Sequence, residues 1–406
     1  MNATEPGRWA GPALDSVLER VAITGAAVGD RFPLFAEPAD GTWTTTRNGS
    51  WTAGFWAGLL WLRARSTGAA ADRRAAAACT ARLTSWVRAD TATRGLILWY
   101  GTAAAEDDPY AAALRARAAR ACLSAFDPAL GIVPWGDAFG GPRLLARADA
   151  APGLVPLLAA AGPAGADAAS THLHHHLDLC LGREAGQRSD ADHAAGAGAT
   201  VAPSADSAAG PSPGPDAGAT AGQEEGEGAR RTPAWSFDGA VAGWRPCAEP
   251  EPGWSRGDAW LLLAVADALL LPDVAGRRPA RLAAAADGLA APTPRYGPLV
   301  PPARTGHPDG PLDTSAAAIT AVALLKLALL PGPGADGYAQ RAAAILGHLV
   351  REHVTDQGPG RPAGMLLNGC YDAGRALAVR HELIWGDFFL ALGLAALNGL
   401  VDLTRL

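Results

Sequence analysis

The sequence predicts an all-α fold, and two observations carry this prediction. First, apolar residues recur every three to four positions along most of the 406-residue chain, which is the spacing of helices with a buried face. Second, β-branched residues are few and alternating apolar and polar residues hardly occur, so strand signals are scarce. A hydrophobic content of 49% is sufficient for a substantial core.

Twelve segments show the helical period, each with boundaries uncertain by roughly two to four residues. They lie at 12–27, 52–66, 70–89, 95–105, 109–126, 150–161, 166–182, 256–271, 277–290, 313–330, 335–353 and 386–402. Asp313 and Asp387 are expected to cap the start of two of these helices. Such a set can form a bundle, a solenoid or a toroid of paired helices. The absence of a fixed sequence repeat disfavours the solenoid.

One stretch, at about 183–232, departs from this pattern. It consists mainly of Ala, Gly, Ser, Pro, Asp and Glu, with almost no large apolar residues. Such a composition cannot bury enough surface to offset its conformational entropy, so we expect a disordered insertion. Because helical patterns resume on both sides, residues 1–406 are predicted to form a single domain that this insertion interrupts.

Charge and cysteine usage exclude several classes of function. The formal net charge is -6 and no basic run occurs, so neither nucleic acid nor a membrane surface is an expected partner. The five cysteines lack any C-x-x-C spacing, which indicates neither a zinc site nor a disulfide framework. The N-terminus has no signal-peptide pattern, and the longest apolar stretch, residues 260–271, is too short to span a bilayer. We therefore expect a cytoplasmic protein with reduced thiols.

The segment W-S-R-G-D-A-W at residues 254–260 is the strongest local signal for a binding site. Trp254 and Trp260 are suited to stack on a ring, and the guanidinium of Arg256 is suited to hold a carboxylate through two hydrogen bonds. For an isolated motif, the alternative of a helix start with two core tryptophans and a surface arginine would be favoured.

Further segments accompany this motif in a fixed order. They are N-G-S-W-T-A-G-F-W-A-G-L-L-W at 48–61, D-T-S-A-A-A-I at 313–319 and L-I-W-G-D-F-F-L at 383–390. Together with residues 254–260 they resemble the signatures of unsaturated glucuronyl and galacturonyl hydrolases, glycoside hydrolase families 88 and 105. This resemblance implies an (α/α)6 barrel, six helical hairpins in a toroid, in agreement with the twelve predicted helices.

The resemblance also implies an activity on small oligosaccharide or uronide substrates. Family members act on sugars whose uronic acid carries a C4–C5 double bond. An aspartic acid protonates the enol ether, water adds at C5, and the resulting hemiketal opens with loss of the glycosidic link. No metal or other cofactor is expected for this chemistry. A general acid of this kind needs a carboxyl group that stays protonated near neutral pH.

The expected site residues follow from the aligned segments. Asp149, in A-D-A-A-P-G-L-V-P-L-L, takes the place of the catalytic acid, although it could instead cap the next helix. Trp254, Arg256 and Trp260 match the substrate-binding set. Trp51 matches a tryptophan that lines the same pocket, and packing in the core is its alternative role.

The chain departs from the family at a second catalytic aspartate, which belongs to a T-H-D-x-G-F segment. Here Gly95 is expected at the position of that aspartate. The enzyme interpretation then requires another carboxylate, such as that of Asp107 or Asp137, to fill the same space. A family glutamine just before residues 254–260 is also missing. Two alternatives therefore stay open: a catalytically impaired carbohydrate-binding homologue, or a diverged hydrolase of another sugar conjugate.

A histidine cluster stands outside these motifs. His172 and His176 are four residues apart and could share a helical face as a metal pair, but no third ligand falls on that face. The sequence therefore favours histidines that face solvent or a loop, with no metal. One of the cluster, which also contains His174 and His175, could reach the pocket.

Overall fold

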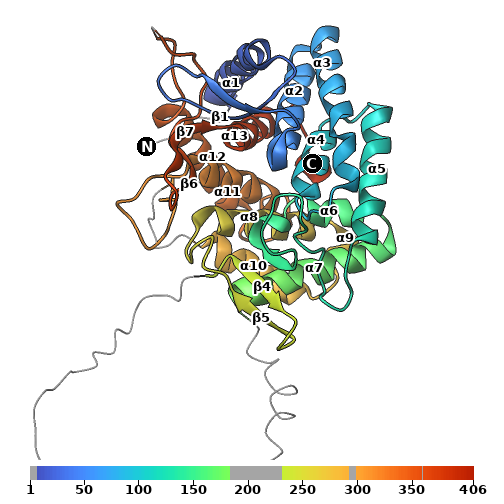
Figure 1. The fold of residues 1–406 in the computed structure, drawn as a ribbon. Coiled ribbons are helices and arrows are strands. Elements are labelled where there is room, and N and C mark those ends of the chain that lie inside the picture. Colours follow the sequence, from blue (N-terminus) through green and yellow to red (C-terminus); the bar gives the residue numbers. More distant parts are fainter. Residues whose placement is uncertain (1–6, 183–230, 292–298, 359) are drawn as a thin grey trace, which may run out of the picture.

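The computed structural model describes residues 7–182, 231–291, 299–358 and 360–406 (Figure 1). Apart from Arg231 and Thr232, the predicted insertion lies outside the described residues. Buried apolar side chains from Ala10 to Leu406 form one contiguous cluster. Among the described residues, no helix has both the length and the apolar character that crossing a membrane requires.

Six of the helices form a closed ring of contacts, in which five of the six neighbouring pairs touch directly and the sixth is joined through a turn next to one of its helices. The short α4 follows a turn of π-helix at Gly95–Trp99, and this turn makes the contact with α6. In order, the ring consists of α2 (Ala53–Thr67), α4 (Tyr100–Ala103), α6 (Leu154–Ala159), α8 (Ser255–Leu270), α11 (Thr314–Leu327) and α13 (Ile384–Leu397). Nearly every residue of α8, α11 and α13 is buried, as expected for helices that are apolar on all sides.

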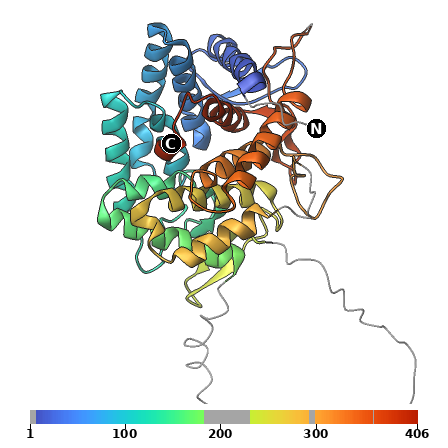
Figure 2. The ribbon, with the colours of Figure 1, turned by 180° about the vertical axis from the view of Figure 1, so that it is seen from behind.

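The outer helices pack against this ring, and each leaves part of its surface exposed (Figures 1 and 2). They are α1 (Gly7–Val28), α3 (Ala70–Arg82), α5 (Pro109–Ser124), α7 (Pro163–Leu181), α10 (Pro279–Ala290) and α12 (Ala335–Glu352). A further short helix, α9 (Pro272–Ala275), connects α8 to α10. Inner and outer helices alternate along the chain.

Two small antiparallel sheets were not expected from the sequence. One has the order β2-β1-β7-β6 and the other the order β3-β4-β5. Their strands are β1 (Phe32–Ala36), β2 (Trp43–Thr46), β3 (Leu145–Arg147), β4 (Ala234–Asp238), β5 (Gly243–Pro246), β6 (Gly369–Asp372) and β7 (Leu377–Leu383). These strands are three to seven residues long, and the alternation signal is weak over so few positions. The fold is therefore predominantly, but not entirely, helical.

The two predicted helix caps have different outcomes. The Asp313 carboxylate accepts hydrogen bonds from the backbone N–H groups of Ser315 and Ala316 at the start of α11, which confirms the first. The prediction for Asp387 is wrong, because α13 already begins at Ile384 and Asp387 lies within its first turn. Asp387 is buried there, and the Leu366 N–H lies 3.4 Å from its Oδ1.

Candidate active site

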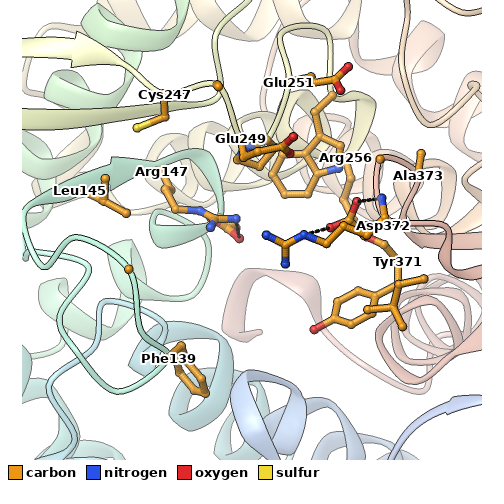
Figure 3. Close-up of a pocket in the computed structure, with 18 of the residues that line it drawn as sticks. Phe139, Leu145, Arg147, Cys247, Glu249, Glu251, Arg256, Tyr371, Asp372 and Ala373 are labelled. Atoms are coloured by element: carbon orange, nitrogen blue, oxygen red, sulfur yellow. Dashed lines mark hydrogen bonds and ion pairs between the residues drawn. The ribbon is translucent and has the colours of Figure 1, made fainter.

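A cavity of about 650 Å³ is lined by residues from widely separated parts of the chain. They come from Trp51, from residues 135–149, from 236–260, from 303–304 and from 370–377. Figure 3 shows Arg147 and Cys247 on one side of this space, and Arg256, Asp372 and Tyr371 on the other. Strands β3, β4, β6 and the start of β7 all contribute, so the two unexpected sheets form part of the pocket wall.

All five of the predicted site residues, Asp149, Trp51, Trp254, Arg256 and Trp260, line this cavity. The chain thus brings together motifs that lie about a hundred and two hundred residues apart in the sequence. Their individual roles remain predictions. The surroundings of each residue indicate what its side chain is able to do.

Trp51 contacts both the pocket and the core. Its indole N–H donates to the Tyr371 hydroxyl over 3.0 Å, and the two rings stack with centroids 6.1 Å apart. Its ring also lies 4.8 Å from that of Trp385, which is fully buried. The two alternatives considered for Trp51 therefore coexist: one side chain lines the cavity and packs on the core.

The two tryptophans of the W-S-R-G-D-A-W segment differ in burial. Trp260 is only 1% exposed and packs against Phe389 and Phe55, with ring centroids 5.4 and 6.2 Å away. Trp254 is half-buried and lies beside the guanidinium of Arg256, 5.1 Å from its ring centroid. Of the pair, Trp254 offers more of its surface to a ligand.

The guanidinium of Arg256 is buried and bonded within the chain. Its Nη1 donates to Asp313 Oδ2 over 2.5 Å and to the Cys370 carbonyl over 2.6 Å, and its Nη2 donates to the Tyr371 carbonyl over 2.7 Å. From the sequence, this fork is expected to face a substrate carboxylate. In the structure it faces Asp313 and two backbone carbonyls instead.

Asp149 lies in a turn of 3-10 helix at Ala148–Ala150 that directly follows β3. The alternative that it caps the next helix is wrong, because the N-cap position of α6 is occupied by Gly153. Arg147 holds the Asp149 carboxylate through two hydrogen bonds, Nε to Oδ1 at 3.1 Å and Nη2 to Oδ2 at 3.2 Å. The pair lies on the wall of the cavity, which both side chains line.

His172 lies directly behind the turn that carries Asp149. The Val133 N–H donates to its Nδ1, which leaves the ring proton on Nε2, 3.3 Å from the Ala150 carbonyl. Burial lowers the pKa of His172 well below its ordinary value and lowers that of His176 to about 4. The neutral imidazole of His172 is thus held by two backbone groups and supports the Asp149 turn.

The expectation that the histidine cluster faces solvent or a loop is wrong for three of its members. His172, His174 and His176 are buried in α7, because this helix packs against α6 and α9. In the part of the chain that the structure describes, no group of three or more His, Cys, Asp or Glu is arranged to hold a metal ion. None of the four histidines is among the described residues that line the cavity.

Gly95 is required by packing. A Cβ atom built on it would lie 2.2 Å from the Leu154 backbone nitrogen, so no side chain fits there. Gly95 therefore matches the glycine, rather than the aspartate, of the T-H-D-x-G-F pattern, and this register places Thr93 at the aspartate. Thr93 is buried, and its hydroxyl lies 2.9 Å from that of Thr91.

Neither of the proposed substitutes for that aspartate reaches the cavity. Asp107 borders a separate, smaller hollow, and Asp137 is exposed and lies outside the described lining. The carboxylates that do line the cavity, besides Asp149, are Glu249, Glu251 and Asp372. Sequence reasoning missed these three, because they lie in loops and at a strand end that carry no family signature.

Arginines of the pocket were also missed. Arg147 lies only two residues before Asp149, a spacing that could have drawn attention to it. Arg304 pairs with Glu251 at 2.5 Å, and Arg375 lies 3.7 Å from Asp372. The cavity thus combines an aromatic wall with four arginines and four carboxylates.

Comparison with solved structures identifies unsaturated glucuronyl hydrolases. The enzyme of Bacillus sp. GL1, described as responsible for glycosaminoglycan degradation, is 20% identical with a TM-score of 0.71, covering 96% of each chain. The enzyme of Streptococcus agalactiae is 17% identical with a TM-score of 0.73, covering 97% of this chain and 93% of that one. Another, described as specific for heparin, is 18% identical with a TM-score of 0.71, covering 98% and 99%.

No protein-family model matches the chain, and no curated protein sequence matches it. The similarity is therefore one of structure at low sequence identity, and it extends over nearly the whole length of both partners. The chain has the fold of the unsaturated glucuronyl hydrolases.

Proposed function

We propose that this chain is a glycoside hydrolase of the unsaturated glucuronyl or galacturonyl type, which hydrates the C4–C5 double bond of unsaturated uronides. The observation that carries the proposal is the convergence of Asp149, Trp51, Trp254, Arg256 and Trp260 in one cavity. The fold shared with unsaturated glucuronyl hydrolases supports it. We interpret the closed ring of helices accordingly as the inner layer of an (α/α)6 barrel.

The cavity has the chemistry that an acidic sugar requires. Its volume of about 650 Å³ is within the range of small-molecule sites, about 300–1,000 Å³. Indole rings such as those of Trp51 and Trp254 provide apolar surfaces for the C–H faces of a sugar. Arginines beside them can bind a carboxylate through paired hydrogen bonds.

In the proposed reaction, Asp149 donates a proton to C4 of the enol ether and positive charge develops at C5. Water then adds at C5, and the Asp149 carboxylate accepts the proton that this water loses. The hemiketal opens, and the bond between C1 and the glycosidic oxygen is lost without direct displacement at C1. Arg256 orders the pocket by linking α8 to β6 and to Asp313.

The experiment follows the ultraviolet absorbance of the conjugated double bond. Wild-type protein should abolish the absorbance of an unsaturated glucuronyl or galacturonyl disaccharide, and Asp149→Asn should not, because an amide cannot donate this proton. Asp137→Asn is the matched control, an exposed carboxylate outside the described lining. Unchanged activity in Asp149→Asn would remove Asp149 from the reaction.

A second candidate is a carbohydrate-binding homologue with impaired catalysis. It is favoured by the pairing of Asp149 with Arg147 and by the presence of Thr93, rather than a carboxylate, at the second catalytic position. Calorimetry distinguishes the two. Binding of unsaturated disaccharides without any loss of absorbance would support this candidate over the hydrolase.

A further inference from the structure

The arginines of the cavity differ in how firmly they are bound to the rest of the chain. Arg256 is 3% exposed and donates to Asp313 and to two carbonyls. Arg304 is held by Glu251, and Arg375 is 75% exposed beside Asp372. Arg147 is different, because its main partner is Asp149, the proposed catalytic acid itself.

The Arg147 side chain is also placed to accept a ligand. Its guanidinium lies over the ring of Trp135, 4.4 Å from the centroid, which fixes its plane. It is 24% exposed, compared with 14% for Asp149, and both line the cavity. The Nε and Nη2 atoms that bind Asp149 form the same two-pronged edge that a uronate carboxylate would use.

We propose that Arg147, rather than Arg256, receives the carboxylate of the substrate, and that it exchanges Asp149 for that carboxylate. This inference rests on the proposed function, since it assumes that a uronide enters the cavity. In the free protein the fork of Arg147 is closed on Asp149. When the substrate carboxylate takes over the fork, Asp149 loses its cationic partner.

The exchange explains how an ion-paired carboxylate becomes a proton donor. A carboxyl group in a largely buried position binds a proton more readily once its arginine partner is withdrawn. Asp149 takes this proton from solvent as the substrate binds, and later delivers it to C4. Behind Asp149 lie neutral His172, at Ala150, and the Cys180 thiol, which the pair Asp258–Arg231 also flanks. The other charged groups of the cavity lining are Arg256, Glu249, Glu251, Arg304, Asp372 and Arg375.

None of those groups provides the same exchange. Asp258 is already held by Arg231 at 2.9 Å, and the Cys180 thiol is buried with its pKa raised to about 12. His172 has both ring nitrogens engaged by backbone groups. Among the described groups around Asp149, Arg147 is the one cation that both binds its carboxylate and lines the cavity.

The test measures binding of an unsaturated uronyl disaccharide and of its neutral analogue, in which the carboxylate is reduced to a hydroxymethyl group. Wild-type protein should prefer the carboxylate, and Arg147→Gln should lose that preference, with affinity for the carboxylate at least about tenfold weaker. Asp149→Asn should bind the carboxylate more tightly than wild type, because the internal competitor for Arg147 has been weakened. A purely structural role for the pair would predict weaker binding in both variants.

The proton provides a second readout. Calorimetry in buffers of different ionisation enthalpy should detect proton uptake when wild type binds the carboxylate ligand, and none in Asp149→Asn. Arg143→Gln is the matched control, since Arg143 holds Asp90 through the same two-pronged geometry but is outside the described lining. It should bind like wild type.

The outcomes separate this inference from the proposed function. Hydrolysis by wild type together with an unchanged carboxylate preference in Arg147→Gln would overturn the inference and leave the hydrolase standing. Arg147-dependent binding and proton uptake without hydrolysis would support the inference and contradict the hydrolase. If wild type bound neither ligand, both would be overturned.

Discussion

The guanidinium of Arg256 and the carboxylate of Asp313 form a buried ion pair with 2.5 Å between Nη1 and Oδ2, and neither side chain is more than 3% exposed. The pair links the start of α8 to the start of α11, where the same carboxylate also caps the helix. Through Cys370 and Tyr371 it also fixes β6, which forms one wall of the cavity. Two of the recognised sequence motifs are therefore bound to each other.

Replacing Arg256 should accordingly reduce stability as well as binding. In Arg256→Met the Asp313 carboxylate stays buried without its cation, which costs about 3–5 kcal/mol. Arg256→Lys should also destabilise the fold, because one ammonium group cannot reproduce bonds to Asp313 and two carbonyls. Urea unfolding measures this change. The control Arg245→Gln removes an exposed pair with Asp238 and should change stability by at most about 1 kcal/mol.

The sequence was sufficient to predict most of the helices for a physical reason, and its resemblance to a known family pointed to five of the residues that line the cavity. Buried helices repeat their apolar residues over many turns, and the motif 254–260 combines residue types that are costly to place together. The sequence did not show which residues far apart in the chain contact one another. Asp313 follows Arg256 by 57 residues, and nothing in either segment specifies that the arginine closes on this carboxylate.

The strands and Gly95 illustrate two other limits. Each strand is at most seven residues long, which leaves little alternation to detect. Some strands also pair with distant ones, as β1 does with β7 across more than three hundred residues. Gly95 was assigned to the wrong position of its motif, because the sequence does not show that its Cα packs against the backbone of Leu154. For Gly95 and for the β1–β7 pair, the deciding contact is non-local.

The two tryptophans of the central motif should separate binding from stability. Trp260→Ala removes a side chain that is 1% exposed between Phe55 and Phe389, so it should cost about 3–5 kcal/mol of unfolding free energy. Trp254→Ala removes a half-buried ring and should weaken sugar binding with a much smaller loss of stability. Thermal unfolding and calorimetry on both variants give the comparison. Equal destabilisation would contradict the assignment of Trp254 to the ligand surface.

Gly95→Asp should destabilise the fold rather than add a carboxylate to the cavity. Its Cβ would lie 2.2 Å from the Leu154 nitrogen and 2.6 Å from the Leu154 Cα, and a backbone cannot move aside as a side chain can. Even Gly95→Ala should destabilise the protein by about 3 kcal/mol, and more for the aspartate.

Gly288→Ala is the control for this substitution. Gly288 lies in α10, where an added Cβ meets nothing within 4 Å, so alanine should be neutral or stabilising by about 1 kcal/mol. Denaturant midpoints for the two variants should therefore shift in opposite directions or differ widely. A stable Gly95→Ala protein would show that the helix turn at Gly95 can separate from α6.

The buried histidines of α7 should make the protein sensitive to acid. Burial lowers the pKa of His176 to about 4 in the folded protein, whereas in the unfolded chain it is about 6.5. Between these values the unfolded chain binds a proton that the folded chain does not. The contribution of such a histidine to the free energy of unfolding is therefore fully present above about pH 6.5. It falls by about 1.4 kcal/mol per pH unit as the pH decreases from about 6.5 to about 4. His172, whose pKa is also lowered by burial, adds to the loss.

Urea unfolding at pH 7.5 and pH 5 measures this acid sensitivity, and His176→Asn tests its origin. Asparagine can still donate to the His172 carbonyl, as the Nδ1 of His176 does over 2.8 Å, but it does not titrate. We expect the variant to be less stable than wild type at pH 7.5, because a smaller side chain leaves a cavity. Its further loss of stability between pH 7.5 and pH 5 should be smaller than that of wild type by about 2 kcal/mol, which is the contribution of one histidine.

The control is His307→Gln, at the surface, which should lose as much stability as wild type over the same pH range. An equal loss in His176→Asn and wild type would mean that the acid sensitivity arises elsewhere in the fold.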